Sequence, residues 1–221
     1  LHPDDMNNAE NRDLVKLVLQ VWSVENEVTE RRFDSERQLI KDMQVSGEQY
    51  DERLLRTFHS PSNAAVAEEI IQEGLREIYG ARALHGKGTY AAGSIKDTFS
   101  YGRVSLQEVG DGVIIHWVVL QLQTVLGNVA VGTQNQSNFG TTCNGDPVST
   151  LTDPAQTMFC TFKDSQHKVT GKIVMGFNPR EAQSERTIAW FLELIVHRTE
   201  FWLLGYLEDT PNWPTMTQLP G

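Results

Sequence analysis

The feature that most constrains the fold is the longest apolar run of the chain, VIIHWVVLQLQTVLGNVAVG at residues 113–132. β-Branched residues dominate this run, and Gly112 and Gly132 bound it, which is the pattern of buried β-structure. The run therefore predicts either one long strand or two shorter strands. In both cases the chain must build a β-sheet around it.

Shorter segments on both sides of this run have strand or helix patterns of their own. The expected helices are rich in charge at helical spacing or follow an N-cap, and the expected strands are short apolar runs after turns. Because helices and strands interleave without a regular βαβ repeat, we expect a mixed sheet in an α+β domain. The expected strands are 14–24, 54–60, 88–92, 157–162 and 171–177; the expected helices are 26–43, one capped by Ser62 or Asn63 and ending near Gly74, and a helical turn over 94–101.

Two further stretches lack such a pattern. Residues 132–154 are rich in Gly, Asn, Thr and Asp without periodicity, so we expect a long surface loop there. Residues 185–207 are strongly apolar, but Glu193, Arg198 and Glu200 interrupt them, which disfavours a membrane span. A helix packed on the core, or an interface for another segment, accounts for this tail.

Composition narrows the class of protein. The 221 residues require only one core, and 39% hydrophobic with 22% charged residues is ordinary for a globular domain. A formal charge of −10 disfavours nucleic acid as a partner, since binding to its phosphates needs clustered Lys and Arg. Cys143 and Cys160 have no paired spacing, so we expect free thiols and no metal site. The first residues lack the pattern of a signal peptide, which favours an intracellular location, cytoplasmic or nuclear.

The segment HGKGTYAAGSIKDTFSYG, residues 85–102, carries the clearest functional pattern. Gly86 and Gly88 allow the main chain to turn tightly and to approach a ligand closely, and Tyr90 and Tyr101 offer two aromatic faces. Thr98 lies between them in sequence with a hydroxyl group. Two aromatic rings with one polar group between them suit a flat heteroaromatic amide such as nicotinamide.

Six segments, in order, resemble the catalytic domain of the PARP family, the diphtheria-toxin-like ADP-ribosyltransferases. The resemblance covers about residues 14–177, while residues 178–221 form an extension without a counterpart, for which we expect a packed helix. It implies a PARP-like fold of mixed, mostly antiparallel sheets with flanking helices, and NAD as co-substrate. The segments are VWSVENEVTERRFDSERQLIKDM, LLRTFHSPS, IIQEGLR, HGKGTYAAGSIKDTFSYG, VVLQLQTVLGNVAVG and MFCTFKDSQHKVTGKIV.

The resemblance also implies roles for single residues. His59 would bind ribose hydroxyls of NAD, Ser60 would place its main-chain groups against the carboxamide, and Arg76 is a candidate for the adenosine half. This chain has Ser60 where the family has a glycine, which would be strained if that position required a positive φ. The remaining implied contacts are stacking by Tyr90 and Tyr101, a hydrogen bond from Thr98 to the carboxamide, and close main-chain approach at Gly88.

The third implied catalytic position, after His59 and Tyr90, is Met158. Polymerising members of the family hold a glutamate there, and a thioether can neither act as a general base nor orient a hydroxyl strongly. The resemblance therefore implies transfer of a single ADP-ribose unit from NAD to a protein acceptor. An NAD hydrolase using the same pocket and a catalytically inactive interaction module are the alternatives.

Each of these residues also has an ordinary structural interpretation. An isolated histidine such as His59 is more often structural than catalytic, and buried tyrosines are usually core residues. The other histidines that we considered have no ligand-like spacing, and we expect them to be ordinary: they are His85, His116, His167 and His197.

Overall fold

A computed structural model describes residues 18–44, 53–76, 85–98, 105–109, 112–133, 136, 139–142 and 145–177. The chain divides into two compact units, Leu1–Asn178 and Pro179–Gly221, and every described residue lies in the first. Several segments lie outside the described residues. They include residues 46–52, most of the segment between Arg76 and Gly88, Tyr101 and the predicted C-terminal helix. Among the described helices, none has both the length and the apolar character needed to cross a membrane.

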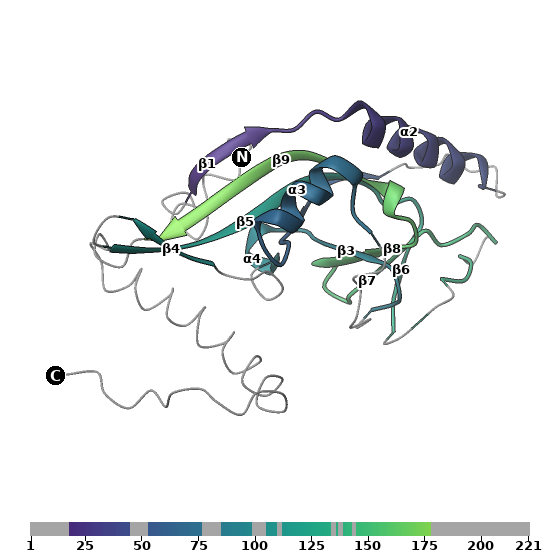
Figure 1. The fold of residues 1–221 in the computed structure, drawn as a ribbon. Helices are drawn as coiled ribbons and strands as arrows, with labels where there is room; N and C mark the ends of the chain where they lie inside the picture. The colour runs from purple at the N-terminus through teal and green to yellow at the C-terminus, as the bar shows by residue number, and fades with distance from the viewer. Residues whose placement is uncertain are drawn as a thin grey trace, which may run out of the picture. The chain divides into compact units, whose positions relative to one another are not determined.

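The described residues form one nine-stranded sheet, which is mostly antiparallel (Figure 1). Its order is β1-β9-β5-β2-β3-β8-β7-β6, with β4 paired to β5, and among the described strands only β6 and β7 pair in parallel. The prediction of a mixed, mostly antiparallel sheet in an α+β domain is thereby confirmed. The strands are β1 (Val18–Ser23), β2 (Leu54–His59), β3 (Thr89–Ala92), β4 (Ser105–Val109), β5 (Gly112–Val125), β6 (Val129–Val131), β7 (Thr150–Thr152), β8 (Met158–Thr161) and β9 (His167–Phe177).

The helices begin and end where capping residues predict. In α2 (Glu27–Asp42) the side chain of Asn26 accepts hydrogen bonds from the first turn. Asn63 caps α3 (Ala64–Glu73), so of the two candidate caps the asparagine is used, and Gly74 ends this helix at a φ of 90°. The short helix α4 (Ile95–Thr98) and the 3₁₀ turn η3 (Asp164–Gln166) complete the set.

The apolar run at 113–132 forms two strands, β5 and β6, which is the second of the two predicted alternatives. The chain turns between them at Gly127, where φ is 56°. The prediction of a surface loop over 132–154 is wrong for its last part. There β7 joins the sheet and is fully buried, with its threonines paired to β8. The sequence did not indicate this strand, because the apolar residues near it are too widely spaced to show a period.

Three apolar clusters of buried residues lie among the described residues, the last of them formed by Phe33 and Ile40 of α2 with Val125 of β5. Helix α3 packs on β5, and Ala67 and Ile70 of the helix contact a cluster that includes Leu120 and Leu122 (Figure 1). The second cluster is smaller and consists of Phe139, Val148, Leu151 and Cys160, with Tyr90 packed against it.

Candidate functional site

The three predicted catalytic residues lie on three neighbouring strands. β2 carries His59, β3 carries Tyr90 and β8 carries Met158, and these strands are consecutive in the sheet. One continuous register joins them, since Phe58 pairs with Ala92 and Ala92 pairs with Met158. Folding therefore brings these positions together although they are far apart in sequence.

The register also decides on which face each side chain lies. Residues paired across antiparallel strands share a face, and neighbours along a strand alternate. Met158 therefore lies on the face of Ala92, and Tyr90, two residues earlier in β3, lies on it too. His59 follows Phe58 and so lies on the opposite face.

The strands β2 and β3 separate at this point. Their described register consists of the single pair Phe58 and Ala92, whereas β2 pairs with β5 over six residues. Beyond that pair the His59 ring replaces the main-chain ladder, with Nδ1 3.0 Å from the carbonyl oxygen of Tyr90. At this point the main chain of β3 is thus bound by a side chain of β2 rather than by its main chain.

The hydrogen bond to Tyr90 fixes the protonation pattern of His59. A carbonyl oxygen only accepts, so Nδ1 must donate. Burial lowers the pKa of His59 and the hydrogen bond to Tyr90 raises it in part, with a net pKa below the usual value. At neutral pH the ring is therefore neutral, and its Nε2 has a free lone pair that accepts a hydrogen bond from a hydroxyl group.

Tyr90 is held at both ends. Its ring packs against the small apolar cluster, and its hydroxyl group donates to the carbonyl oxygen of Gly86 at 2.6 Å. The hydroxyl oxygen of Tyr90 also accepts from the main-chain N–H of His85 at 2.9 Å. Tyr90 therefore fixes the described end of the loop that precedes β3, and this contact is structural whether or not a ligand binds.

Thr98 is placed by α4, which packs against β2 and β3. Its side chain is 2% exposed, and its hydroxyl group donates to the carbonyl oxygen of Ile95 at 2.6 Å. With its proton used in this way, the oxygen retains lone pairs and would accept from a carboxamide N–H rather than donate. Its predicted partner in sequence, Tyr101, lies outside the described residues.

Ser60 is accommodated without strain. Among the described residues other than glycine, Arg53 and Gln156 have positive φ, and Ser60 does not. Its buried hydroxyl group donates to the carbonyl oxygen of Val118 at 3.1 Å, which ties the end of β2 to β5. The concern that a serine is strained in place of a glycine is therefore removed.

The close approach at Gly88 is to a strand of the same chain. A Cβ added there would lie 2.2 Å from the carbonyl oxygen of Thr161 and 2.9 Å from Sγ of Cys160. Gly88 thus lets the start of β3 pack against β8, and this packing alone explains why the position has no side chain.

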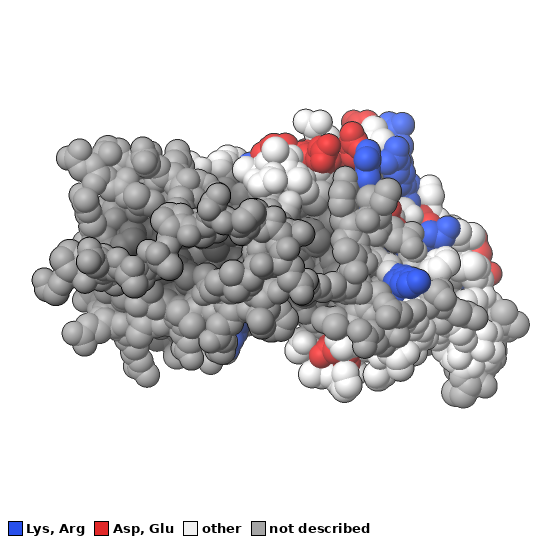
Figure 2. All heavy atoms as spheres, turned by 60° about the horizontal axis from the view of Figure 1, so that its bottom comes forward, with Lys and Arg blue, Asp and Glu red and all other residues white. Residues whose placement is uncertain are grey.

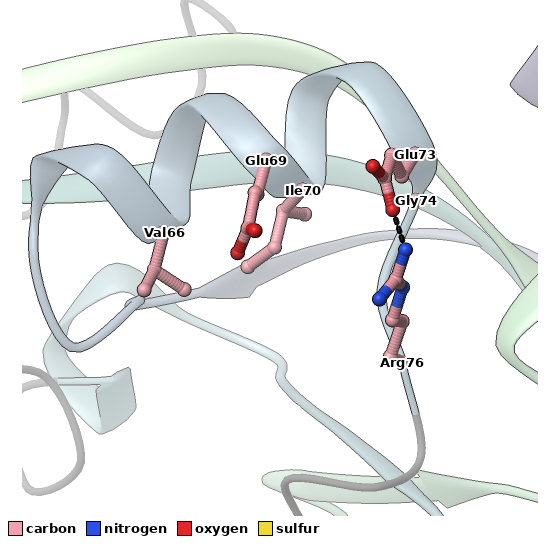
Figure 3. Close-up of a pocket in the computed structure, with 6 residues that line it drawn as sticks. All are labelled: Val66, Glu69, Ile70, Glu73, Gly74 and Arg76. Carbon is pink, nitrogen blue, oxygen red and sulfur yellow. Dashed lines mark ion pairs between the residues drawn. The ribbon is translucent and has the colours of Figure 1, made fainter.

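Arg76 lies at the rim of a shallow hollow beside α3 (Figure 3). Its guanidinium is half-exposed and forms an ion pair with Glu73, one turn earlier. The hollow is also lined by Val66, Glu69, Ile70 and Gly74, so the guanidinium shares it with two carboxylates. An anionic ligand that bound Arg76 here would have to displace Glu73.

Met158 lies in the sheet with its side chain 8% exposed. The nearest acidic residue before it, Asp153, accepts from the N–H groups of Met158 and Thr157, both at 2.7 Å, and from the N–H of Ala155. Burial raises the pKa of Asp153, but these hydrogen bonds lower it more, so the pKa is below its usual value. This carboxylate is thus ionised and committed to the turn before β8.

The charges on the described surface are mixed. Figure 2 shows acidic and basic side chains next to each other on the part of this face that is described. The described residues contain no cluster of three or more His, Cys, Asp or Glu that could hold a metal ion.

One residue that the sequence gave no reason to select is His167. It is 3% exposed, and hydroxyl groups of Thr124 and Thr161 bind its two ring nitrogens at 2.8 and 2.7 Å. Burial and, to a smaller extent, the charge of His59 together lower its pKa to about 3, although a hydrogen bond to the main chain of Thr89 opposes them. No spacing in the sequence marks this residue, because its partners come from two other strands.

No protein-family model matches the sequence, and no curated protein is similar enough to match it.

Proposed function

We propose that the chain is an NAD-dependent mono-ADP-ribosyltransferase with a PARP-like fold. The observation that carries this proposal is the separation of β2 from β3 at His59 and Tyr90. A dinucleotide at this gap would meet the acceptor nitrogen of His59, the main chain of Ser60 and the ring of Tyr90. These are the groups that the resemblance to the family assigns to NAD.

The residues would act by orienting the substrate. Nε2 of His59, unprotonated at neutral pH, would accept from a ribose hydroxyl and hold the nicotinamide ribose in a reactive orientation. The bond between nicotinamide and ribose then breaks, and its electron pair leaves with the neutral nicotinamide. A nucleophile of the protein acceptor, such as a carboxylate, forms the new bond to the same carbon.

The environment of Met158 supports transfer of one unit. Its thioether has no proton to exchange, and Asp153, the nearest preceding carboxylate, is bound to the turn. Neither group can therefore activate a ribose hydroxyl for chain elongation.

A non-catalytic interaction module is the second candidate. The hydroxyl groups of Tyr90 and Thr98, both assigned to the pocket, are already bonded to main-chain carbonyls of this chain. A pocket whose polar groups satisfy one another can persist without a ligand.

Incubation with NAD labelled on its adenosine half tests the proposal, with nicotinamide release and protein labelling followed in parallel. His59→Asn is the informative variant, because an asparagine amide can still donate to the carbonyl of Tyr90 while the acceptor at Nε2 is lost. We expect it to lose at least about tenfold in kcat/KM. Lys41→Ala, on the exposed side of α2, is the matched control and should keep wild-type activity.

The outcomes separate the alternatives. Labelled protein supports the transferase, and nicotinamide release without labelling identifies an NAD hydrolase. If neither occurs, and a nicotinamide analogue in large excess does not raise the melting temperature, the interaction module is correct. Equal activity of His59→Asn and the wild type would refute the site.

A further inference from the structure

A chain of hydroxyl groups and one imidazole crosses the interior of the sheet. Thr57 of β2 and Thr124 of β5 bring their hydroxyl oxygens to 2.6 Å of each other, and Thr124 contacts Nδ1 of His167 in β9. On the other side of the ring, Nε2 contacts the hydroxyl oxygen of Thr161 in β8. The hydroxyl of Thr161 also lies within 3.3 Å of the carbonyl oxygen of Thr89 in β3. Five strands are thus joined by side chains.

The direction of these hydrogen bonds follows from their end. The hydroxyl of Thr161 lies 3.3 Å from the carbonyl oxygens of Thr89 and Lys163, which only accept, so its proton is directed to one of them and its oxygen accepts from Nε2–H of His167. Nδ1 then accepts from Thr124, and Thr124 accepts from Thr57. Every hydroxyl proton has an acceptor in this arrangement, and it requires His167 to be neutral.

The chain of hydrogen bonds reaches the strands that carry the proposed site. Thr57 precedes His59 by two residues on β2 and therefore shares its face, and Thr89 directly precedes Tyr90 on β3. His167 itself joins β9 to β8 across the interior, although these strands are not neighbours in the sheet. A positive charge on His59 would lower the pKa of His167.

We propose that His167 is a positioning residue, whose hydrogen bonds to Thr124 and Thr161 hold β2 and β3 at the separation where His59 binds the carbonyl of Tyr90. Only the expected effect of the His167 variants on turnover rests on the proposed function. It assigns no contact with substrate to His167. Its direct consequence is structural and can be measured in the ligand-free protein: without His167, His59 loses its fixed Nδ1–H tautomer.

Two variants separate positioning from folding. His167→Phe fills a similar volume but leaves the hydroxyl groups of Thr124 and Thr161 without the ring. The triple variant His167→Phe, Thr124→Val, Thr161→Val removes those groups as well, and replacing both partners of the ring by apolar residues should restore part of the lost stability, although Thr57 still loses its acceptor. Ile40→Ala is the control, because it weakens the cluster of Phe33, Ile40 and Val125 without removing a group that bonds to His167.

The first measurement is the tautomer of His59 in ¹⁵N-histidine-labelled protein without ligand, with His59→Asn used for assignment. We expect Nδ1–H in the wild type and in Ile40→Ala, and a mixture with Nε2–H in both His167 variants. The second measurement is nicotinamide release, for which we expect both His167 variants to lose about 10- to 100-fold in kcat/KM, mostly in kcat. The control should lose little below its melting temperature.

The results decide between the two roles. A triple variant that regains both stability and the fixed tautomer would overturn the proposal, because His167 would then be structural only. If the wild type has no activity on NAD, the proposed function fails and the tautomer alone decides. In that case loss of the Nδ1–H form in both His167 variants supports the positioning role, and its retention refutes it.

Discussion

The side-chain amide of Asn26 donates to the main-chain carbonyl oxygen of Ile71 at 2.9 Å, which joins the beginning of one helix to the end of another. The same side chain accepts from the N–H groups of Val28 and Thr29 in the first turn of α2, and it also donates to the carbonyl oxygen of Gln72 in α3. Asn26 thus satisfies main-chain groups of both helices at once.

Replacement of Asn26 separates these two contributions. Asn26→Ala should lower the free energy of unfolding by about 2 kcal/mol, with about half from the N-cap and half from the bonds to α3. Asn26→Asp keeps the cap but loses the donors, so it should cost about 1 kcal/mol. Urea denaturation measures both values, and equal losses in the two variants would show that the bonds to α3 alone matter.

His167 should make the domain sensitive to mild acid. Its pKa of about 3 in the folded state lies below the value of about 6.5 expected when unfolded, so the unfolded state binds the proton first as pH falls. Stability is therefore complete above pH 6.5 and falls towards pH 3, with a loss of about 2.7 kcal/mol at pH 4.5. Denaturation at pH 7 and pH 4.5 tests this. His167→Gln, which cannot titrate, should lose less between the two values, and an identical loss would contradict the assignment.

Gly88→Ala should destabilise the domain by about 1–3 kcal/mol, because the new methyl group meets the rigid main chain of β8 at Thr161. Gly93→Ala is the matched control. Its methyl group would lie in ordinary contact, 3.5 Å from the nearest oxygen, and should change stability by no more than about 0.5 kcal/mol. Thermal melts of the two variants measure the difference, and similar melting temperatures would contradict the packing role of Gly88.

Met158→Glu should not produce a polymerase. The side chain is buried beside Ala92, so a carboxylate there costs about 1–3 kcal/mol of stability, and burial raises its pKa. Elongation also needs a site for the incoming chain. Met158→Leu should stay within about 1.5 kcal/mol of the wild type. Gel analysis of the products should show single additions for wild type and Met158→Glu alike, and a ladder of long chains would contradict the assignment.

Local patterns predicted the elements whose causes are local. The ends of α3 followed from Asn63 and Gly74, and the strands β2, β3 and β8 followed from short apolar runs between turn residues. These strands are neighbours in the sheet, although His59 lies on the opposite face from Tyr90 and Met158.

Elements that depend on distant partners escaped prediction. The threonines of β7 look like loop residues until β8 pairs with them, and β4 becomes a strand by forming a hairpin with β5. His167 has no local signature, since its buried position depends on hydroxyl groups from β5 and β8. Pairings between distant segments cannot be inferred from the local pattern of a single sequence.

A single residue pair joins β2 to β3, so the main-chain ladders of the sheet fall into two groups of strands. We call these groups plates, and the line between β2 and β3 the seam. The plate of β1, β9, β5 and β2 is tied by long ladders, and that of β3, β8, β7 and β6 by shorter ones. Opening along the seam breaks few main-chain hydrogen bonds, so amide exchange should be fastest there. Any molecule that binds across the seam adds contacts between the two plates where main-chain pairing is sparse, and should therefore slow amide exchange there.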